Sequence, residues 1–369
     1  MAWKQNIIED FKQLVSFDSI SFHERKSADW LFARLKSMGF SVEEDQAGSH
    51  YGGDTGNIFA VLDGELDGDP VIFCAHMDVV EPGSGKKSVL EKDGTIHSAG
   101  DTVLGADDIS GILEILYGVQ LVLDSGKPHK KIEILFTIGE ELYVKGSDVF
   151  DYSKVTAKQA YVLDLSGAVG TAARRAPSII SVRAEIKGKA AHAGFEPERG
   201  IHAIAVAAEA VTRLSMGHVD EDTTFNIGTI NGGTDTNIVP DSCVVTGEIR
   251  SYDHSKALEY VKNTEKIFAE EADKAGATAE VTHQVHLVAY ETPVESRTVK
   301  DFLKACEKTR LPGTLTETFG GSDNNSFAKH GIEGLVLSCG MYQAHSTNEY
   351  TKIKDLYDGA ELIRTLIEL

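Results

Sequence analysis

Basic residues are scarce in this chain of 369 residues: Lys and Arg number 36 against 57 Asp and Glu, and the formal net charge is −21. Because phosphate contacts need a basic surface, this balance argues against a nucleic-acid partner. It also disfavours docking on an anionic membrane. No apolar run approaches the roughly 18 residues of a membrane span, and the N-terminal residues lack the apolar stretch of a secretory signal. These absences predict a soluble, cytoplasmic protein without a membrane partner.

Cysteine is also rare, and several catalytic motifs are missing. The four cysteines, Cys74, Cys243, Cys306 and Cys339, are scattered without a CxxC pair. In a chain of this length they indicate buried, reduced thiols rather than a disulfide framework. There is no HExxH motif, no GxSxG elbow and no complete phosphate-binding loop. The composition, 41% hydrophobic and 25% charged, is nevertheless sufficient for a large folded core.

Helical patterns alternate with short apolar strands in the first and last parts of the chain. Strands are expected at residues 57–62, 71–75, 131–138, 160–165 and 334–338. Helices are expected within residues 6–38, at 105–124 and 299–309, and from about residue 353. Apolar strands separated by helices predict an α/β domain with a mostly parallel, helix-covered sheet.

The middle of the chain has a different pattern. Half-exposed alternation at residues 178–186, 224–230, 242–250 and 281–288 predicts four antiparallel strands, and residues 200–216 and 254–275 have helical spacing. These elements form a small α+β domain inserted into the first one. The predicted division is residues 1–177 and 289–369 for the catalytic, metal-binding domain and 178–288 for the inserted lid or dimerisation domain.

His76 and Asp78 follow the apolar run 71–75. Residues two apart project to the same face of an extended chain, so both side chains can reach one site. A carboxylate beside a histidine can fix its tautomer and raise its basicity as a metal ligand. On its own, an ordinary ion pair explains these two residues at least as well.

Acidic residues follow or interrupt two other strands. Glu140 and Glu141 come after strand 131–138, at the carboxyl end where α/β sheets place their sites. One of them could bind metal while the other acts as a general base. Asp164 lies among apolar residues of strand 160–165, where a buried acid needs a partner or a cation.

A helix start and a C-terminal segment complete the set. Asp107 begins an apolar helix, where capping and the helix dipole favour an acid in any case. His345 begins the segment His-Ser-Thr-Asn-Glu after the last apolar strand. A parallel sheet would gather at one edge His76, Asp107, Glu141, Asp164 and His345. Nitrogen and carboxylate ligands without thiolate suit zinc, with cobalt or manganese as alternatives, and predict a two-metal hydrolytic site.

These motifs resemble those of the co-catalytic zinc peptidases, the family of peptidase T, carboxypeptidase G and the aminoacylases. The resemblance covers essentially the full length, and the form Leu-Gly-Ala-Asp-Asp at residues 104–108 is most similar to peptidase T. It implies two Zn²⁺ per chain, one held by His76, Asp107 and Asp164 and the other by Asp107, Glu141 and His345. It also implies that Asp78 orients His76, that Glu140 is the general base, and that the Asp107–Asp108 peptide is cis.

The inserted domain carries further motifs of this family. The resemblance implies that His192, Asn237 and Arg250 contact the substrate. Chemistry agrees, because a histidine can donate to a developing oxyanion and an arginine offers two parallel hydrogen bonds to a carboxylate. Without the resemblance, a loop histidine and a surface ion pair explain His192 and Arg250. The polar turn 320–325 is expected to form a pocket wall.

The predicted function is hydrolysis of short peptides by a two-metal exopeptidase, most simply an aminotripeptidase, with metal-activated water and Glu140 as the general base. An N-acyl-amino-acid amidohydrolase or a dipeptidase on the same scaffold is the first alternative. A catalytically silent peptide-binding scaffold is the second. Edge strands in the inserted domain, together with the resemblance, predict a homodimer through that domain with His192 acting on the partner's site.

Overall fold

The computed structural model describes residues 2–369 and divides the chain into two compact units. The first unit contains the residues up to Arg175, Glu291–Thr318 and Ser322–Leu369. The second unit contains Ala176–Tyr290 and Phe319–Gly321. The chain therefore leaves the first unit after one long segment, builds the second, and returns.

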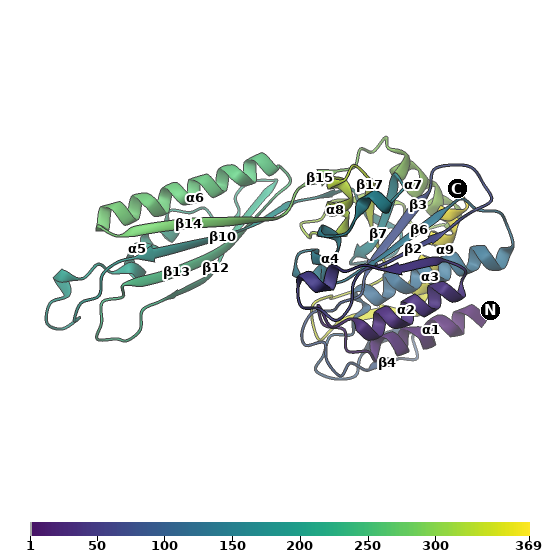
Figure 1. The fold of residues 1–369 in the computed structure, drawn as a ribbon, viewed down its shortest axis with the longest axis horizontal. Helices are drawn as coiled ribbons and strands as arrows, with labels where there is room; N and C mark the ends of the chain where they lie inside the picture. The colour runs from purple at the N-terminus through teal and green to yellow at the C-terminus, as the bar shows by residue number, and fades with distance from the viewer. Residues whose placement is uncertain (1) are drawn as a thin grey trace. The chain divides into compact units, whose positions relative to one another are not determined.

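An eight-stranded, mainly parallel sheet forms the centre of the first unit (Figure 1). Its order is β1 (Ser41–Glu44), β2 (Ile58–Leu62), β6 (Ile132–Thr137), β3 (Val71–His76), β7 (Gln159–Leu165), β17 (Glu333–Ser338), β8 (Thr171–Ala173) and β16 (Thr314–Thr316). The central strands β6, β3, β7 and β17 are parallel, whereas β1 and β2 pair antiparallel at one edge. The parallel strands read as continuous apolar runs because both faces of the sheet are covered.

Successive residues of the central strands pack into two different cores. Phe73 and Ala75 of β3 face a core shared with helices, while Ile72 and Cys74 face a second core on the other side. This alternation is the period of two that a strand imposes on its side chains. Residues of α1, α2, α3, α7 and α9 fill the first core, and the segment 150–157 with Phe327 of α8 fills the second. Figure 1 shows α1, α2 and α3 together on one side of the sheet.

The helices of this unit are α1 (Ala2–Val15), α2 (Arg25–Ser37), α3 (Ala106–Ser125), α4 (Lys145–Asp148), α7 (Arg297–Thr309), α8 (Asp323–Lys329) and α9 (Ile353–Ile367), with short 3₁₀ turns η1 (Ala47–His50), η2 (Glu140–Leu142) and η3 (Tyr152–Lys154). A small sheet is formed by β18 (Tyr350–Lys352), β5 (Thr95–Ser98) and β4 (Ser88–Leu90), and β15 (Tyr290–Glu291) pairs with β9 (Arg175–Ala176). Within residues 2–369, no helix is long and apolar enough to cross a membrane.

The second unit is an antiparallel sheet with two helices on one face. Its strands run in the order β11 (Gly217–His218), β12 (Thr223–Gly232), β13 (Ser242–Ser251), β10 (Ser178–Lys187) and β14 (Thr278–Leu287), and its helices are α5 (Ala203–Thr212) and α6 (His254–Ala275), with the 3₁₀ turn η4 (Pro197–Arg199). Apolar residues of both helices pack against the sheet in a single core. The predicted fold class, a mostly parallel α/β domain with an inserted α+β domain, is confirmed.

Two local features differ from the expectation. The polar stretch 320–325 is not a turn throughout, because Ser322 caps α8 and forms a capping box with Asn325. The second unit also has a fifth strand, β11, of only two residues. Neither element is long enough for a hydrophobic period to reveal it in the sequence.

Candidate metal centre

Three parallel strands bring the predicted site residues to one edge of the sheet. His76 is the last residue of β3, where it pairs with Thr137 at the end of β6, and β6 leads directly into Glu140. Asp164 lies near the end of β7, two residues beyond the pairing of Cys74 with Val162. Parallel strands align their carboxyl ends, so their terminal side chains converge.

The helix start and the C-terminal segment reach the same place. Asp107 lies at the beginning of α3, after Gly105, whose φ of 79° is in the left-handed region. The Asp107 Oδ1 atom is 2.9 Å from His76 Nε2, and its Oδ2 atom is 3.3 Å from His345 Nε2. His345 Nε2 is also 2.9 Å from Glu141 Oε2. The expected cis peptide bond between Asp107 and Asp108 is present.

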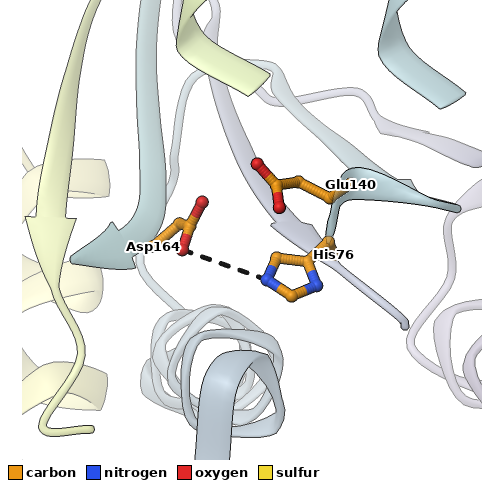
Figure 2. A group of neighbouring side chains, drawn as sticks. All are labelled: His76, Glu140 and Asp164. Atoms are coloured by element: carbon orange, nitrogen blue, oxygen red, sulfur yellow. Dashed lines mark ion pairs between the residues drawn. The ribbon is translucent and has the colours of Figure 1, made fainter. Parts of the chain in front are cut away.

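Figure 2 shows the side chains of His76, Glu140 and Asp164 pointing toward one shared space from β3, the segment after β6, and β7. His76 Nε2 lies 3.9 Å from Asp164 Oδ1. One donor atom from each of these three residues lies within 4.8 Å of the others, and the same holds for His76, Asp107 and Glu141. The structure thus brings together all five predicted ligands and the predicted base.

The cluster carries more negative charge than its two histidines compensate. Burial, and next the charge of Asp164, raises the pKa of Glu140 well above its usual value. Burial and the charge of Asp107 do the same for the pKa of Asp164. Against the effect of burial, hydrogen bonds with His345 and His76 lower the pKa of Asp107. Hydrogen bonds, above all with Asp107, raise the pKa of His345 to about 10.

This donor set fits divalent cations. Buried carboxylates that lack a cationic partner are costly, and a metal ion supplies the missing charge. Imidazole nitrogens and carboxylate oxygens are ligands that zinc accepts, and its binding would displace the proton that His345 otherwise holds. The site can therefore hold metal, and its donor chemistry leaves zinc, cobalt and manganese as candidates.

Two buried carboxylates hold the segment that carries the glutamates. Asp78 Oδ1 accepts the N–H of Glu140 at 2.9 Å, and its Oδ2 accepts the N–H of Glu141 at 3.3 Å. The side chain of His76 meets Asp78 mainly through the backbone, since Nδ1 is 3.0 Å from the Asp78 carbonyl oxygen and 3.5 Å from Oδ1. Glu24 Oε1 accepts the N–H of Gly139 at 3.0 Å. Glu24 was not predicted, because an acid just before a helix is ordinary in a sequence.

The three residues predicted to bind substrate lie in the second unit. His192 and Asn237 are neighbours in adjacent loops, since the Ala193 N–H donates to the Asn237 carbonyl oxygen at 2.9 Å. Arg250 is near the other end of β13, where its guanidinium contacts Glu248 at 2.6 Å and the Phe319 carbonyl oxygen at 2.7 Å. The structure therefore brings together His192 and Asn237 but not Arg250.

Comparisons with known proteins agree with this architecture. A family model described as the peptidase dimerisation domain matches residues 176–276, and one described as peptidase family M28 matches residues 57–181. The aminopeptidase PepT of Bacillus cereus is 35% identical with a TM-score of 0.93, covering 99% of this chain and 98% of that one. A tripeptidase of Staphylococcus aureus is 32% identical with a TM-score of 0.96 and the same coverage.

The fold, the site and these similarities define the class as an exopeptidase with an inserted dimerisation domain. The uncharacterised protein YqjE of Bacillus subtilis is a further relative, 37% identical over 100% of this chain and 99% of its own length. The chain belongs to the M20 peptidase family, in the group of peptidase T. The resemblance seen in the sequence is confirmed.

Proposed function

We propose that this protein is a two-metal aminotripeptidase that removes the N-terminal residue from short peptides. The observation that carries the proposal is the convergence of two histidines and four carboxylates at one sheet edge. Similarity to a tripeptidase and to PepT supports the substrate class. Four buried free cysteines suit action in the reducing cytoplasm.

The proposed ligands are those of the sequence prediction: His76, Asp107 and Asp164 for one cation, and Asp107, Glu141 and His345 for the other. Cations bound there would polarise the scissile carbonyl and make water a stronger nucleophile near neutral pH. Zinc is the proposed ion.

Glu140 is the proposed general base. Its carboxylate would take a proton from the attacking water and return it to the leaving amine. Asp78 fixes the backbone of Glu140 and so aims its side chain.

His192 is proposed as the donor to the developing oxyanion. Its Nδ1 atom accepts the N–H groups of Gly194 at 3.1 Å and Phe195 at 3.2 Å. A neutral imidazole whose Nδ1 accepts must carry its proton on Nε2, so Nε2 is a ready donor. Arg250 is proposed to bind the substrate carboxylate, with Asn237 beside His192 as a further substrate contact. The second unit, with boundaries near residues 178–288, is proposed to form the homodimer.

A panel of di-, tri- and N-acylated substrates, assayed after loading with zinc, cobalt or manganese, tests the proposal. We expect two bound ions per chain and hydrolysis of tripeptides with a free amine. Preference for blocked amino acids would indicate an amidohydrolase, and preference for dipeptides a dipeptidase. Metal-loaded protein that hydrolyses nothing would indicate a silent scaffold.

A further inference from the structure

Glu349, four residues after His345, makes an unusual set of contacts for a buried acid. Its side chain is nearly fully buried, with 1% of the residue exposed. Oε2 accepts the N–H groups of Leu104 and Gly105, both at 2.7 Å, and Oε1 accepts the N–H of Asp107 at 2.8 Å. Three short hydrogen bonds from backbone amides satisfy the carboxylate, and Glu349 forms no ion pair within residues 2–369.

These bonds join the segment of Asp107, the carboxylate proposed to bridge the two ions, to the segment of His345. Asp107 lies between the two histidines, with one oxygen near His76 and the other near His345. Glu349 holds the backbone of Asp107 from one side, and the short segment 346–348 ties Glu349 to His345. A shift of Asp107 would therefore change its distance to both histidines at once.

The N–H groups that Glu349 accepts belong to an irregular segment before the regular part of α3. Leu104 and Gly105 precede the helix, and Asp107 has non-helical backbone angles, φ −82° and ψ 99°. The regular helix that follows is capped separately, because the Asp108 side chain accepts the N–H of Gly111 at 3.2 Å. Buried N–H groups outside a helix or strand need another acceptor, and Glu349 supplies it for Leu104, Gly105 and Asp107.

We propose that Glu349 is a positioning residue. It fixes Asp107 between the two metal sites and fixes the position of the His345 segment relative to Asp107. The inference rests on the two-metal function proposed above. Glu349 is not itself a ligand in this scheme, since its oxygens are directed at backbone amides. Residues that orient metal ligands in this way typically change metal affinity or activity by about 10- to 100-fold when they are replaced.

The test is Glu349→Gln, because an amide keeps the size of the side chain but presents an NH₂ group to at least one of the three N–H donors. Co²⁺ is the probe and is titrated into the metal-free protein. Binding is measured by calorimetry and by the visible absorption of the bound Co²⁺. We expect the affinity for Co²⁺ to fall about 10- to 100-fold, with a changed absorption spectrum. At saturating Co²⁺ we expect a lower kcat with little change in KM.

Glu133→Gln is the matched control. Glu133 is a fully buried carboxylate in β6 that likewise accepts backbone N–H groups, from Thr156 and Ala157 at 3.1 Å, but it lies at the start of the strand, away from the metal edge. This variant should lose stability without losing affinity for Co²⁺. If Glu349→Gln also loses only stability and binds Co²⁺ as the wild type does, the inference is wrong.

A second variant covers the case in which Glu349→Gln does not fold. Glu349→Asp keeps the charge but shortens the side chain, and we expect it to fold with a smaller loss of Co²⁺ affinity. Wild-type Co²⁺ affinity and spectrum in this variant would overturn the inference. A wild-type protein that binds no Co²⁺ would instead contradict the proposed function, so the two failures are distinguishable.

Discussion

Single buried carboxylates, rather than exposed ion pairs, fix the geometry of the centre. Asp78 and Glu349 each accept two or more backbone N–H groups on the segments that carry the proposed ligands, and Glu24 accepts one, that of Gly139. Such bonds compensate the desolvation of a buried charge and are stronger than those between neutral groups. The backbone that carries the proposed ligands Asp107 and Glu141 is thus fixed by hydrogen bonds to buried carboxylates.

Replacement of the proposed base should separate binding from chemistry. In Glu140→Gln the amide cannot take a proton, so we expect kcat to fall by at least about 100-fold with two metal ions still bound and KM nearly unchanged. Steady-state kinetics together with elemental analysis of the purified variant would measure this. A variant that keeps a tenth of the wild-type turnover would show that Glu140 is not the base.

Glu24 should make stability depend on pH. Burial and the charge of Asp78 raise its pKa from 4.5 to about 8. A carboxyl whose pKa is higher in the folded state stabilises the fold fully below pH 4.5, and this contribution is lost as the pH rises through 8. Glu24→Gln mimics the protonated form and does not titrate at this position. Between pH 5 and 7.5, the free energy of unfolding of the wild type should therefore fall relative to that of the variant by about 1 kcal/mol per pH unit.

Urea unfolding of the two metal-free proteins at several pH values would measure the difference. Gln can keep the acceptor for Phe22 and Gly139, which Glu24 Oε1 contacts at 2.9 and 3.0 Å. A constant difference between wild type and variant over this pH range would contradict the prediction.

The long elements and the metal edge were predictable from the sequence, whereas short and polar elements were not. The expected helix 254–275 coincides with α6, because twenty-two residues with a regular apolar face leave little ambiguity. The strands that carry His76 and Asp164 at or near their ends were predictable because buried parallel strands are continuous apolar runs. In contrast, α8 begins with three polar residues, Asp323, Asn324 and Asn325, which are buried. Asp323 accepts hydrogen bonds from the hydroxyl groups of Thr137 and Ser147, which are distant in the sequence.

Roles that depend on contacts between residues distant in the sequence could not be predicted from the sequence either. Glu349 lies 242 residues from Asp107, and Glu24 lies 115 residues from Gly139. The local bond from the Phe22 N–H to Glu24 does not reveal the contact of Glu24 with Gly139. The proposed ligands, by comparison, were suggested by their own positions at or after strand ends and, for Asp107, at a helix start.

The contact between α3 and α9 should depend on a glycine. A Cβ atom at Gly118 would lie 2.6 Å from the Cβ of Ile363 and 2.9 Å from the carbonyl oxygen of Ala360. Gly118→Ala gains about 1 kcal/mol of helix propensity, but overpacking of a tight core costs about 1–3 kcal/mol. Because the contact is with a buried, branched side chain and with backbone, we expect a net loss of about 1–2 kcal/mol in the free energy of unfolding.

Thermal or urea unfolding measures the effect, with Gln120→Ala on the same helix as the control. The Gln120 side chain donates to the exposed Asp124, so that substitution should change stability by less than about 0.5 kcal/mol. Equal stability of Gly118→Ala and the wild type would show that the two helices can move apart at little cost.

On the scale of the whole molecule, the second unit distributes its proposed substrate contacts between two ends of one sheet. The loops with His192 and Asn237 leave the sheet where β10 ends at Lys187 and β13 begins at Ser242. Arg250 lies eight residues further along β13, and a strand of that length spans about 26 Å. A tripeptide is too short to reach both ends of this sheet.

A second copy of the chain resolves this separation, because a symmetric dimer can present His192 of one subunit to the site of the other. The matched dimerisation domain supports such an assembly. We therefore predict that two inactive variants complement each other: Glu140→Ala, which lacks the base, and His192→Ala, which lacks the oxyanion donor. After subunit exchange by partial unfolding and refolding, half of the dimers are mixed, and each mixed dimer has one site with both residues intact. About a quarter of the wild-type sites should then be active. If His192 acts within its own chain, every site lacks one of the two residues, and activity stays at the level of the separate variants although mixed dimers have formed.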